Sequence, residues 1–119
     1  MKYRHYAPKA PVIVVCGRPD LTAKYIAEHT GADTGVICFD EFSRLFSGKL
    51  QRLGPSWDQQ EQARRLFDAL RWFDTTDVTC IYAQCPEETG LGRAVVNRLK
   101  KAAGFQTVTV ELPSGGEST

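Results

Sequence analysis

The sequence predicts an α/β fold: a three-layer, Rossmann-like domain with a mostly parallel sheet of four to five strands. Runs of apolar, β-branched residues alternate with segments of helical period. The first run, residues 12–16, is apolar without interruption, as in strands covered on both faces. The chain has 119 residues, 42% of them hydrophobic and 24% charged, which suits one globular domain with a core of its own.

The two ends differ in composition from the part between them. Residues 1–11 are polar, basic and aromatic and end with Pro8 and Pro11, which favours an extended arm or linker. Residues 113–119 are rich in Ser and Gly, which is typical of a flexible tail. We therefore expect a linker arm over 1–11, a body over 12–112 and a tail over 113–119.

The first strand, 12–16, is followed by a turn over 17–20. Asp20 is predicted to cap a helix that reaches Thr30 and stops at Gly31.

A second buried strand is predicted over 36–39. Asp40 could cap a short helix that Gly48 ends, and residues 50–53 predict a brief strand. The short helix is expected to present three apolar side chains on one face: Phe42, Leu45 and Phe46.

The third long element has the clearest period. Ser56 and Gln59 have the spacing of a capping box. Apolar residues then recur at helical intervals, at Ala63, Leu66, Phe67, Leu70 and Phe73. A strand over 78–83 is expected to follow.

A final helix is predicted from about Gly90 to Ala103, with Gly104 after its end. Its expected core face consists of Leu91, Ala94, Val95, Leu99 and Ala102. Basic residues in its last turns suit the negative end of the helix dipole. Residues 107–112 alternate in polarity and predict an edge strand.

Charge and composition exclude several classes of protein. Fifteen Lys and Arg against fourteen Asp and Glu leave a net charge of +1, so we expect no direct nucleic acid or membrane partner. The longest apolar run is too short to span a bilayer, and the first residues lack a secretory signal. Four cysteines without a C-x-x-C motif predict small buried side chains and a cytoplasmic location. No residues have zinc-ligand spacing, so no metal site is expected.

In such folds, ligands bind at the carboxyl ends of the strands. Gly17 and Arg18 follow the first strand, and Gly90 and Gly92 precede the last helix, so their backbone N–H groups could face an anion. The alternative is that these glycines only permit a tight turn and close packing. Neighbouring Glu87 and Glu88 favour the alternative, because they would repel a phosphate.

The arm concentrates cationic and aromatic side chains. Basic or titratable residues and two tyrosines lie within eight positions: Lys2, Tyr3, Arg4, His5, Tyr6 and Lys9. Arg and Lys suit phosphate groups, and Tyr can stack on a ring or close over it. The alternative is a solvated basic terminus whose tyrosines pack on the body.

Several strings of residues resemble one known family. Residues 1–9 read MKYRHYAPK, residues 53–55 LGP, residues 63–71 ARRLFDALR followed by Phe73-Asp74, and residues 90–104 GLGRAVVNRLKKAAG. In this order they resemble the linker and C-terminal domain of the two-domain L-threonylcarbamoyladenylate synthases. The resemblance covers nearly the whole chain, and the family's C-terminal domain is Rossmann-like.

The resemblance implies a function for the complete protein. The family makes threonylcarbamoyl-AMP from L-threonine, bicarbonate and ATP, with Mg²⁺, for the threonylcarbamoyl modification of adenosine 37 in tRNA. That chemistry belongs to an N-terminal YrdC-like catalytic domain, which this sequence lacks, so we expect the present chain to bind no cofactor and to be inactive alone. By resemblance, Lys2, Tyr3, Arg4, His5 and Tyr6 are the substrate-binding lid residues.

Three hypotheses for the body remain open at this point. It could be an accessory domain that positions the lid, an autonomous nucleotide or small-ligand binding module, or an interaction domain. Saturable ATP binding to this chain would favour the second, and docking of a separate catalytic domain would favour the third.

Overall fold

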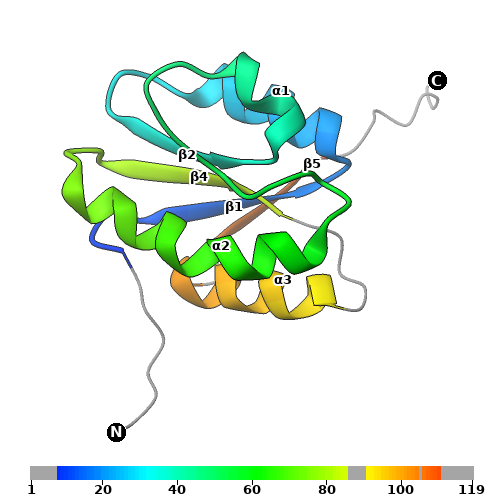
Figure 1. The fold of residues 1–119 in the computed structure, drawn as a ribbon. Coiled ribbons are helices and arrows are strands. Elements are labelled where there is room, and N and C mark those ends of the chain that lie inside the picture. Colours follow the sequence, from blue (N-terminus) through cyan, green and yellow to red (C-terminus); the bar gives the residue numbers. More distant parts are fainter. Residues whose placement is uncertain (1–7, 86–90, 105, 111–119) are drawn as a thin grey trace, which may run out of the picture.

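The computed structural model describes residues 8–85, 91–104 and 106–110, with the side chain of Leu91 left out. One five-stranded sheet lies at its centre, with helices on both faces, and every strand pairing is parallel (Figure 1). The strand order is β3-β2-β4-β1-β5. The strands are β1 (Val12–Gly17), β2 (Thr34–Cys38), β3 (Lys49–Arg52), β4 (Cys80–Gln84) and β5 (Thr107–Val110). The predicted α/β class and the five predicted strands are confirmed.

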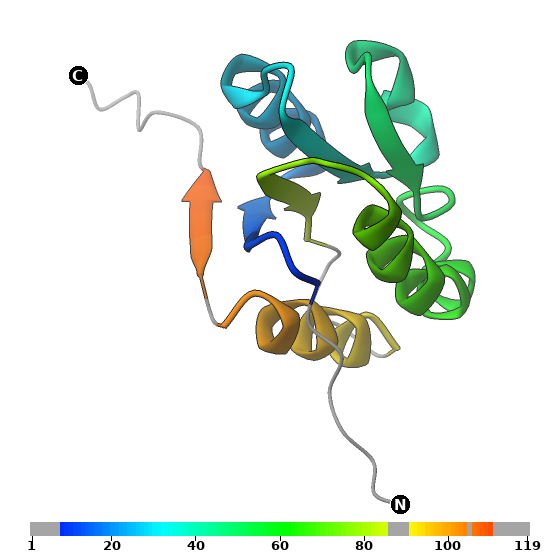
Figure 2. The same ribbon diagram turned by 90° about the vertical axis from the view of Figure 1, so that its left-hand side faces the viewer.

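The helices form the two outer layers. On one face of the sheet lie α1 (Pro19–His29) and the 3₁₀ helix η1 (Asp40–Leu45). On the other face α2 (Gln59–Trp72) and α3 (Leu91–Ala102) pack side by side (Figure 2). A short 3₁₀ turn, η2 (Phe73–Thr75), continues α2. Helices and strands therefore alternate along the chain, as the sequence predicts.

The two central strands are buried because both of their faces are covered. Val12, Val14 and Val15 of β1 and Ile81 and Ala83 of β4 have no exposed surface. Strand β5 alternates between exposed and half-buried positions, which confirms the edge strand over its described residues. Residues 111–112 of the predicted strand lie outside the described residues.

The sheet separates two hydrophobic clusters. The larger lies beneath α2 and α3 and includes Leu66, Leu70, Phe73, Val95 and Leu99. The smaller lies beneath α1 and consists of Val15, Ile26, Val36 and Cys38, with partly buried side chains around it. Gly35 allows the larger cluster to approach the sheet, since a Cβ there would lie 2.4 Å from the Phe73 ring.

Three of the predicted helix caps are wrong. Helix α1 begins two residues earlier than expected, with Arg18 at the N-cap position, and Asp20 pairs with the Arg18 side chain. Asp40 is the first residue of η1 and not its cap, because Phe39 stands at the N-cap position and the Asp40 carboxylate accepts from the Gly54 N–H. Helix α2 is capped by Asp58, whose carboxylate accepts from the Glu61 N–H at 3.0 Å. Aspartate is as good a cap as serine, and Asp58 is the residue whose carboxylate reaches the third N–H of the helix.

Some apolar side chains face solvent instead of the core. Leu45 is 55% exposed and Phe67 is 42% exposed, and Ala63 and Ala94 are exposed as well. In η1 no residue is buried, because a 3₁₀ helix has three residues per turn and does not form the expected α-helical stripe. On α2, Leu66 and Leu70 bury the core face, while Phe67 lies beside it.

Candidate functional site

The carboxyl edge of the sheet has the topology that the sequence predicts for a ligand site. The chain leaves β1 and β2 towards the face of α1 and η1, and it leaves β3 and β4 towards the face of α2 and α3 (Figure 1). Because β1 and β4 are neighbours, the connections diverge between them. This divergence is the switch point at which α/β folds commonly bind ligands.

The predicted residues at this edge have partners within the chain. Gly17 has φ +138°, and a Cβ on it would lie 2.3 Å from the Val110 carbonyl oxygen. The Arg18 guanidinium donates two hydrogen bonds of 2.7 Å to Asp20 and lowers the pKa of that exposed carboxyl to about 2. The Gly92 N–H donates to Gln59 Oε1 at 3.0 Å.

These contacts favour close packing at Gly17 and Gly92, and an exposed ion pair with Asp20 at Arg18, over an anion site. Gly90 lies outside the described residues.

A buried amide that sequence reasoning missed fills the switch point. The side chain of Gln84 has no exposed surface. Its Oε1 accepts from the Phe39 N–H at 2.8 Å, and its Nε2 donates to the Pro19 carbonyl at 2.9 Å and to Thr22 Oγ1 at 3.0 Å. Gln84 thus joins the end of β4 to the end of β2 and to the first turn of α1. The sequence signal for this buried amide is a glutamine at the end of an apolar strand.

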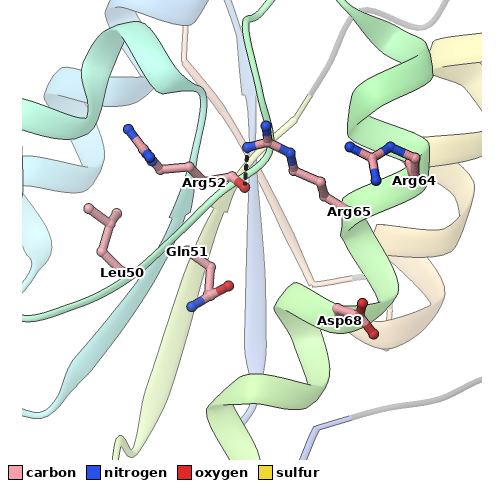
Figure 3. Close-up of a pocket in the computed structure, with 6 residues that line it drawn as sticks. All are labelled: Leu50, Gln51, Arg52, Arg64, Arg65 and Asp68. Atoms are coloured by element: carbon pink, nitrogen blue, oxygen red, sulfur yellow. Dashed lines mark hydrogen bonds between the residues drawn. The ribbon is translucent and has the colours of Figure 1, made fainter.

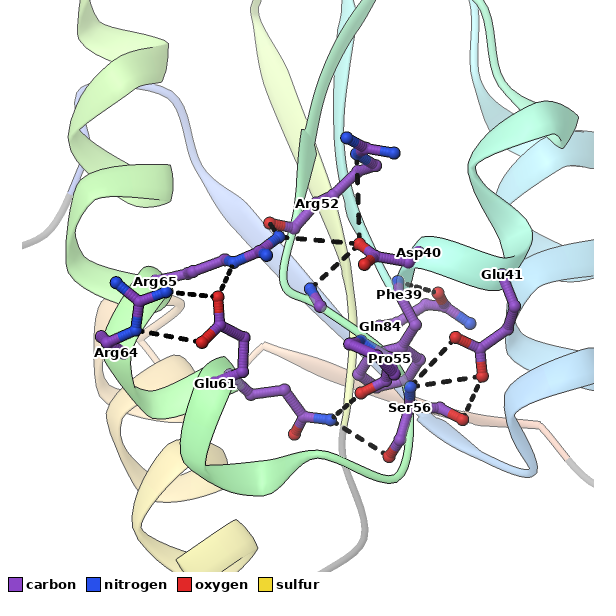
Figure 4. Close-up of polar contacts among 12 residues, drawn as sticks. Phe39, Asp40, Glu41, Arg52, Pro55, Ser56, Glu61, Arg64, Arg65 and Gln84 are labelled. Carbon is purple, nitrogen blue, oxygen red and sulfur yellow. Dashed lines mark hydrogen bonds and ion pairs between the residues drawn. The ribbon is translucent and has the colours of Figure 1, made fainter.

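A second polar group lies between β3, η1 and α2; we call Asp40, Arg52, Glu61, Arg64 and Arg65 the charged cluster (Figure 4). Glu61 accepts from Arg64 at 2.5 and 3.0 Å and from Arg65 at 2.5 Å, which lowers the pKa of its carboxyl. Asp40 lies 3.7 Å from Arg65 and 4.0 Å from Arg52, and it accepts from the Gly54 N–H at 3.1 Å. The charged cluster therefore links η1, β3 and α2 by ion pairs.

The three arginines of the charged cluster line an open cavity of about 390 Å³, together with Leu50, Gln51 and Asp68 (Figure 3). Arg64 and Arg65 pair with Glu61, Arg52 and Arg65 lie near Asp40, and Asp68 adds a third negative charge to the lining. The cavity therefore offers an incoming anion no uncompensated charge. We interpret the cluster as a structural clamp. The sequence signal for part of it was the i, i+4 spacing of Glu61 and Arg65.

The described end of the arm is attached at the opposite side of the sheet from the carboxyl edge, where the strands begin. The Lys9 N–H donates to Asp74 Oδ1 at 3.1 Å, Ala10 packs against the larger cluster, and the Pro11 carbonyl accepts from the Ile81 N–H at 2.9 Å. The predicted lid residues Lys2, Tyr3, Arg4, His5 and Tyr6 lie outside the described residues. The arm thus enters at the amino edge, away from Gly17 and Gly92.

The cysteines are placed as packing residues. Cys38 and Cys85 are buried, and burial raises the pKa of the Cys38 thiol to about 12, so that it stays protonated at neutral pH. Within the described ranges, no three His, Cys, Asp or Glu side chains group as metal ligands would. Among those same residues, no helix has the length and apolarity needed to cross a membrane.

Comparison with known proteins gives relatives of much greater length. The chain is 43% identical over 116 residues to the threonylcarbamoyl-AMP synthase of Pyrococcus abyssi and 37% identical over 111 residues to that of Bacillus subtilis. These matches cover 92% and 91% of this chain, but only 33% and 32% of the relatives. The chain thus spans about a third of the length of these relatives.

Solved structures agree with this fold. A crystal structure of P. abyssi Sua5 complexed with L-threonine superposes with a TM-score of 0.67 at 41% identity, over 93% of this chain and 33% of that one. A variant of the same protein, with an adjacent histidine and tyrosine replaced by alanine, gives a TM-score of 0.64 at 39% identity. This match covers 87% of this chain and 30% of that one. The separate C-terminal domain from Pyrococcus horikoshii gives 0.67 at 35% identity, over 87% of this chain and 100% of that one.

A family profile described as the C-terminal domain of threonylcarbamoyl-AMP synthase matches residues 1–104. This match includes the arm and every described element except the last strand. The chain therefore belongs to the family of threonylcarbamoyl-AMP synthase C-terminal domains.

Proposed function

We propose that this chain is the linker arm and accessory C-terminal domain of an enzyme that makes threonylcarbamoyl-AMP from L-threonine, bicarbonate and ATP. The single observation that carries the proposal is the family match over residues 1–104, which includes the arm. The relatives are about three times as long, which leaves room for an N-terminal catalytic domain in the same chain. In the proposal that domain, and not this one, holds L-threonine, ATP and Mg²⁺ and acts in the cytoplasm, and its product serves tRNA modification.

The arm is proposed to close over the catalytic cleft. Lys2 and Arg4 would lie near the phosphates of ATP, and Tyr3 and Tyr6 would exclude water. Threonylcarbamoyl-AMP is a mixed anhydride that water hydrolyses, so a lid over it preserves the product. One of the solved relatives was altered at an adjacent histidine and tyrosine, and His5-Tyr6 is such a pair in this sequence.

The role proposed for the body is to hold the base of that lid. The hydrogen bonds of Lys9 to Asp74 and of Pro11 to Ile81 attach the arm to a rigid edge of the sheet. A fixed base limits the positions that a short segment can reach and so reduces the entropy lost when the lid closes. The described residues at the carboxyl edge have internal partners, which does not favour a separate nucleotide-binding module.

The test uses the full-length enzyme with a single substitution in the arm. Tyr3→Ala or Arg4→Ala should reduce release of pyrophosphate from ATP in the presence of L-threonine and bicarbonate by at least tenfold, while the unfolding midpoint of this domain stays unchanged. Lys24→Ala, an exposed cation of α1, is the control and should leave turnover at the wild-type level. Wild-type turnover in both arm variants would disprove the lid, and turnover by the 119-residue chain alone would disprove its accessory role.

A further inference from the structure

The charges of this chain are unevenly distributed over the fold. Helices α2 and α3 contain seven Lys and Arg and two Asp and Glu, a net charge of +5. The rest of the chain contains eight Lys and Arg and twelve Asp and Glu, a net charge of −4. Both helices lie on the same face of the sheet (Figure 2). The overall charge of +1 therefore conceals a basic side and an acidic remainder.

Most of the cations of α3 are not neutralised by the described part of the chain. Arg93, Arg98 and Lys101 are exposed, and none makes an ion pair with a described residue. Helix α3 contains no Asp or Glu. This differs from Arg64 and Arg65 of α2, which are paired with Glu61. Arg93, Arg98 and Lys101 are therefore available to a partner.

Two adjoining hollows lie beside these cations. The first, of about 130 Å³, lies at the seam of α2 and α3 and is lined by Ala63, Leu66, Ala94, Val95 and Arg98. The second, of about 210 Å³, is lined by Ala94, Asn97, Arg98 and Lys101. They share Ala94 and Arg98, so together they form one shallow depression that runs from the seam across α3. The exposed alanines on both helices keep it open.

An exposed aromatic ring lies on the same face. Phe67 follows Ala63 by one turn of α2 and is 42% exposed. The Arg71 guanidinium lies 5.3 Å from the centroid of the Phe67 ring, a cation–π contact. The face therefore combines cations, an amide, a shallow depression and an aromatic ring.

We propose that the outer face of α2 and α3 binds a single-stranded nucleic acid. Its phosphates would pair with Arg98, Lys101 and Arg93, and an unpaired base would stack at Phe67. An acidic protein surface could satisfy the same cations, and we favour a nucleic acid because each of its bases has a π-face that can stack on the Phe67 ring. This proposal does not rest on the proposed function. It also revises the expectation that the chain has no nucleic acid partner, which was based on its net charge. Binding depends on the local electrostatic field of a surface and not on the net charge of the whole chain.

The test is fluorescence anisotropy of a labelled 12-nucleotide oligouridine with this chain. We expect saturable binding at 50 mM salt that weakens about sevenfold to eighteenfold at 200 mM, as two or three neutralised phosphates of a single strand predict. The double variant Arg98→Glu, Lys101→Glu should lose at least tenfold in affinity. The matched control, Lys24→Glu with Arg44→Glu, changes the net charge equally on the α1 face and should lose less than threefold.

Two further measurements distinguish the kind of partner. Phe67→Ala should weaken oligouridine binding at least fivefold, and a 12-residue polyglutamate should bind at least tenfold more weakly than oligouridine. The absence of binding at 50 mM salt, or equal losses in the two charge-reversed variants, would disprove the site. Polyglutamate binding of equal strength would disprove the nucleic acid in favour of an acidic protein. If the double Glu variant does not fold, Arg98→Gln with Lys101→Gln is used, with an expected loss of at least threefold.

Discussion

Single side chains decide how the ends of the strands are held together. The amide of Gln84 satisfies three groups, one at the end of β2 and two in the first turn of α1, and each of them is buried or partly buried. An apolar side chain of similar size would leave the Phe39 N–H without this partner, whereas the Pro19 carbonyl would still accept from the Thr22 hydroxyl. A buried polar group that loses its partner destabilises a protein more than the hydrogen bond itself stabilises it.

We therefore expect Gln84→Leu to lower the free energy of unfolding by about 1–3 kcal/mol for each group left unpaired. Gln60→Leu, at an exposed position of α2, is the control and should change it by less than about 0.5 kcal/mol. Urea denaturation followed by circular dichroism measures both. Equal effects from the two substitutions would contradict the role of Gln84.

At the scale of elements, α2 tests which apolar side chains the core needs. Leu70 is 1% exposed and lies in the larger cluster, whereas Phe67 is 42% exposed, although both belong to the same apolar period in the sequence. Leu70→Ala should destabilise the domain by about 2–5 kcal/mol. Phe67→Ala should cost less than about 1 kcal/mol. Thermal unfolding measures the difference, and a larger effect of Phe67→Ala would show that the helix packs by another face.

The same helix shows what the sequence can and cannot predict. Periodicity identifies α2 and the strands, because burial on one face or two leaves a repeating pattern. It does not decide between Phe67 and Leu66 as the more buried neighbour, which depends on where α3 lies. The predicted cap at Ser56 is wrong for a related reason: Ser56 donates to Glu41, a partner 15 residues away, and Asp58 takes its place.

The candidate sites also differ in how far the sequence predicts them. The switch point follows from strand alternation and is predictable, whereas the charged cluster joins Asp40, Arg52 and Glu61 through tertiary contacts that no local pattern contains. The arm was identified from its composition and its resemblance to a family, and its role as a lid stays a prediction.

At the scale of the whole molecule, Cys38, the last residue of β2, can report on the opening of the sheet. The Cys38 side chain has no exposed surface, and burial raises the pKa of its thiol to about 12. At pH 8 Cys38 in the folded protein therefore offers an alkylating reagent neither access nor a thiolate. Labelling requires unfolding.

We expect iodoacetamide to modify Cys38 at a rate that increases with urea and with the Leu70→Ala substitution. Half-buried Cys80 provides an internal comparison and should react faster under native conditions. Peptide mapping by mass spectrometry measures both rates. A Cys38 rate that is independent of urea and equal to that of Cys80 would show that the sheet opens locally at β2.

The strand order also governs how this domain folds as the ribosome makes it. Strand β1 is synthesised first, yet it pairs only with β4 and β5, which are synthesised last. The apolar Val12–Gly17 segment must therefore wait while more than 60 further residues are translated before its first partner strand begins at Cys80. At 5–20 residues per second, the interval from Gly17 to the end of β4 at Gln84 is about 3 to 13 s. During this time the nascent chain carries an unpaired strand that chaperones or the ribosome surface must shield.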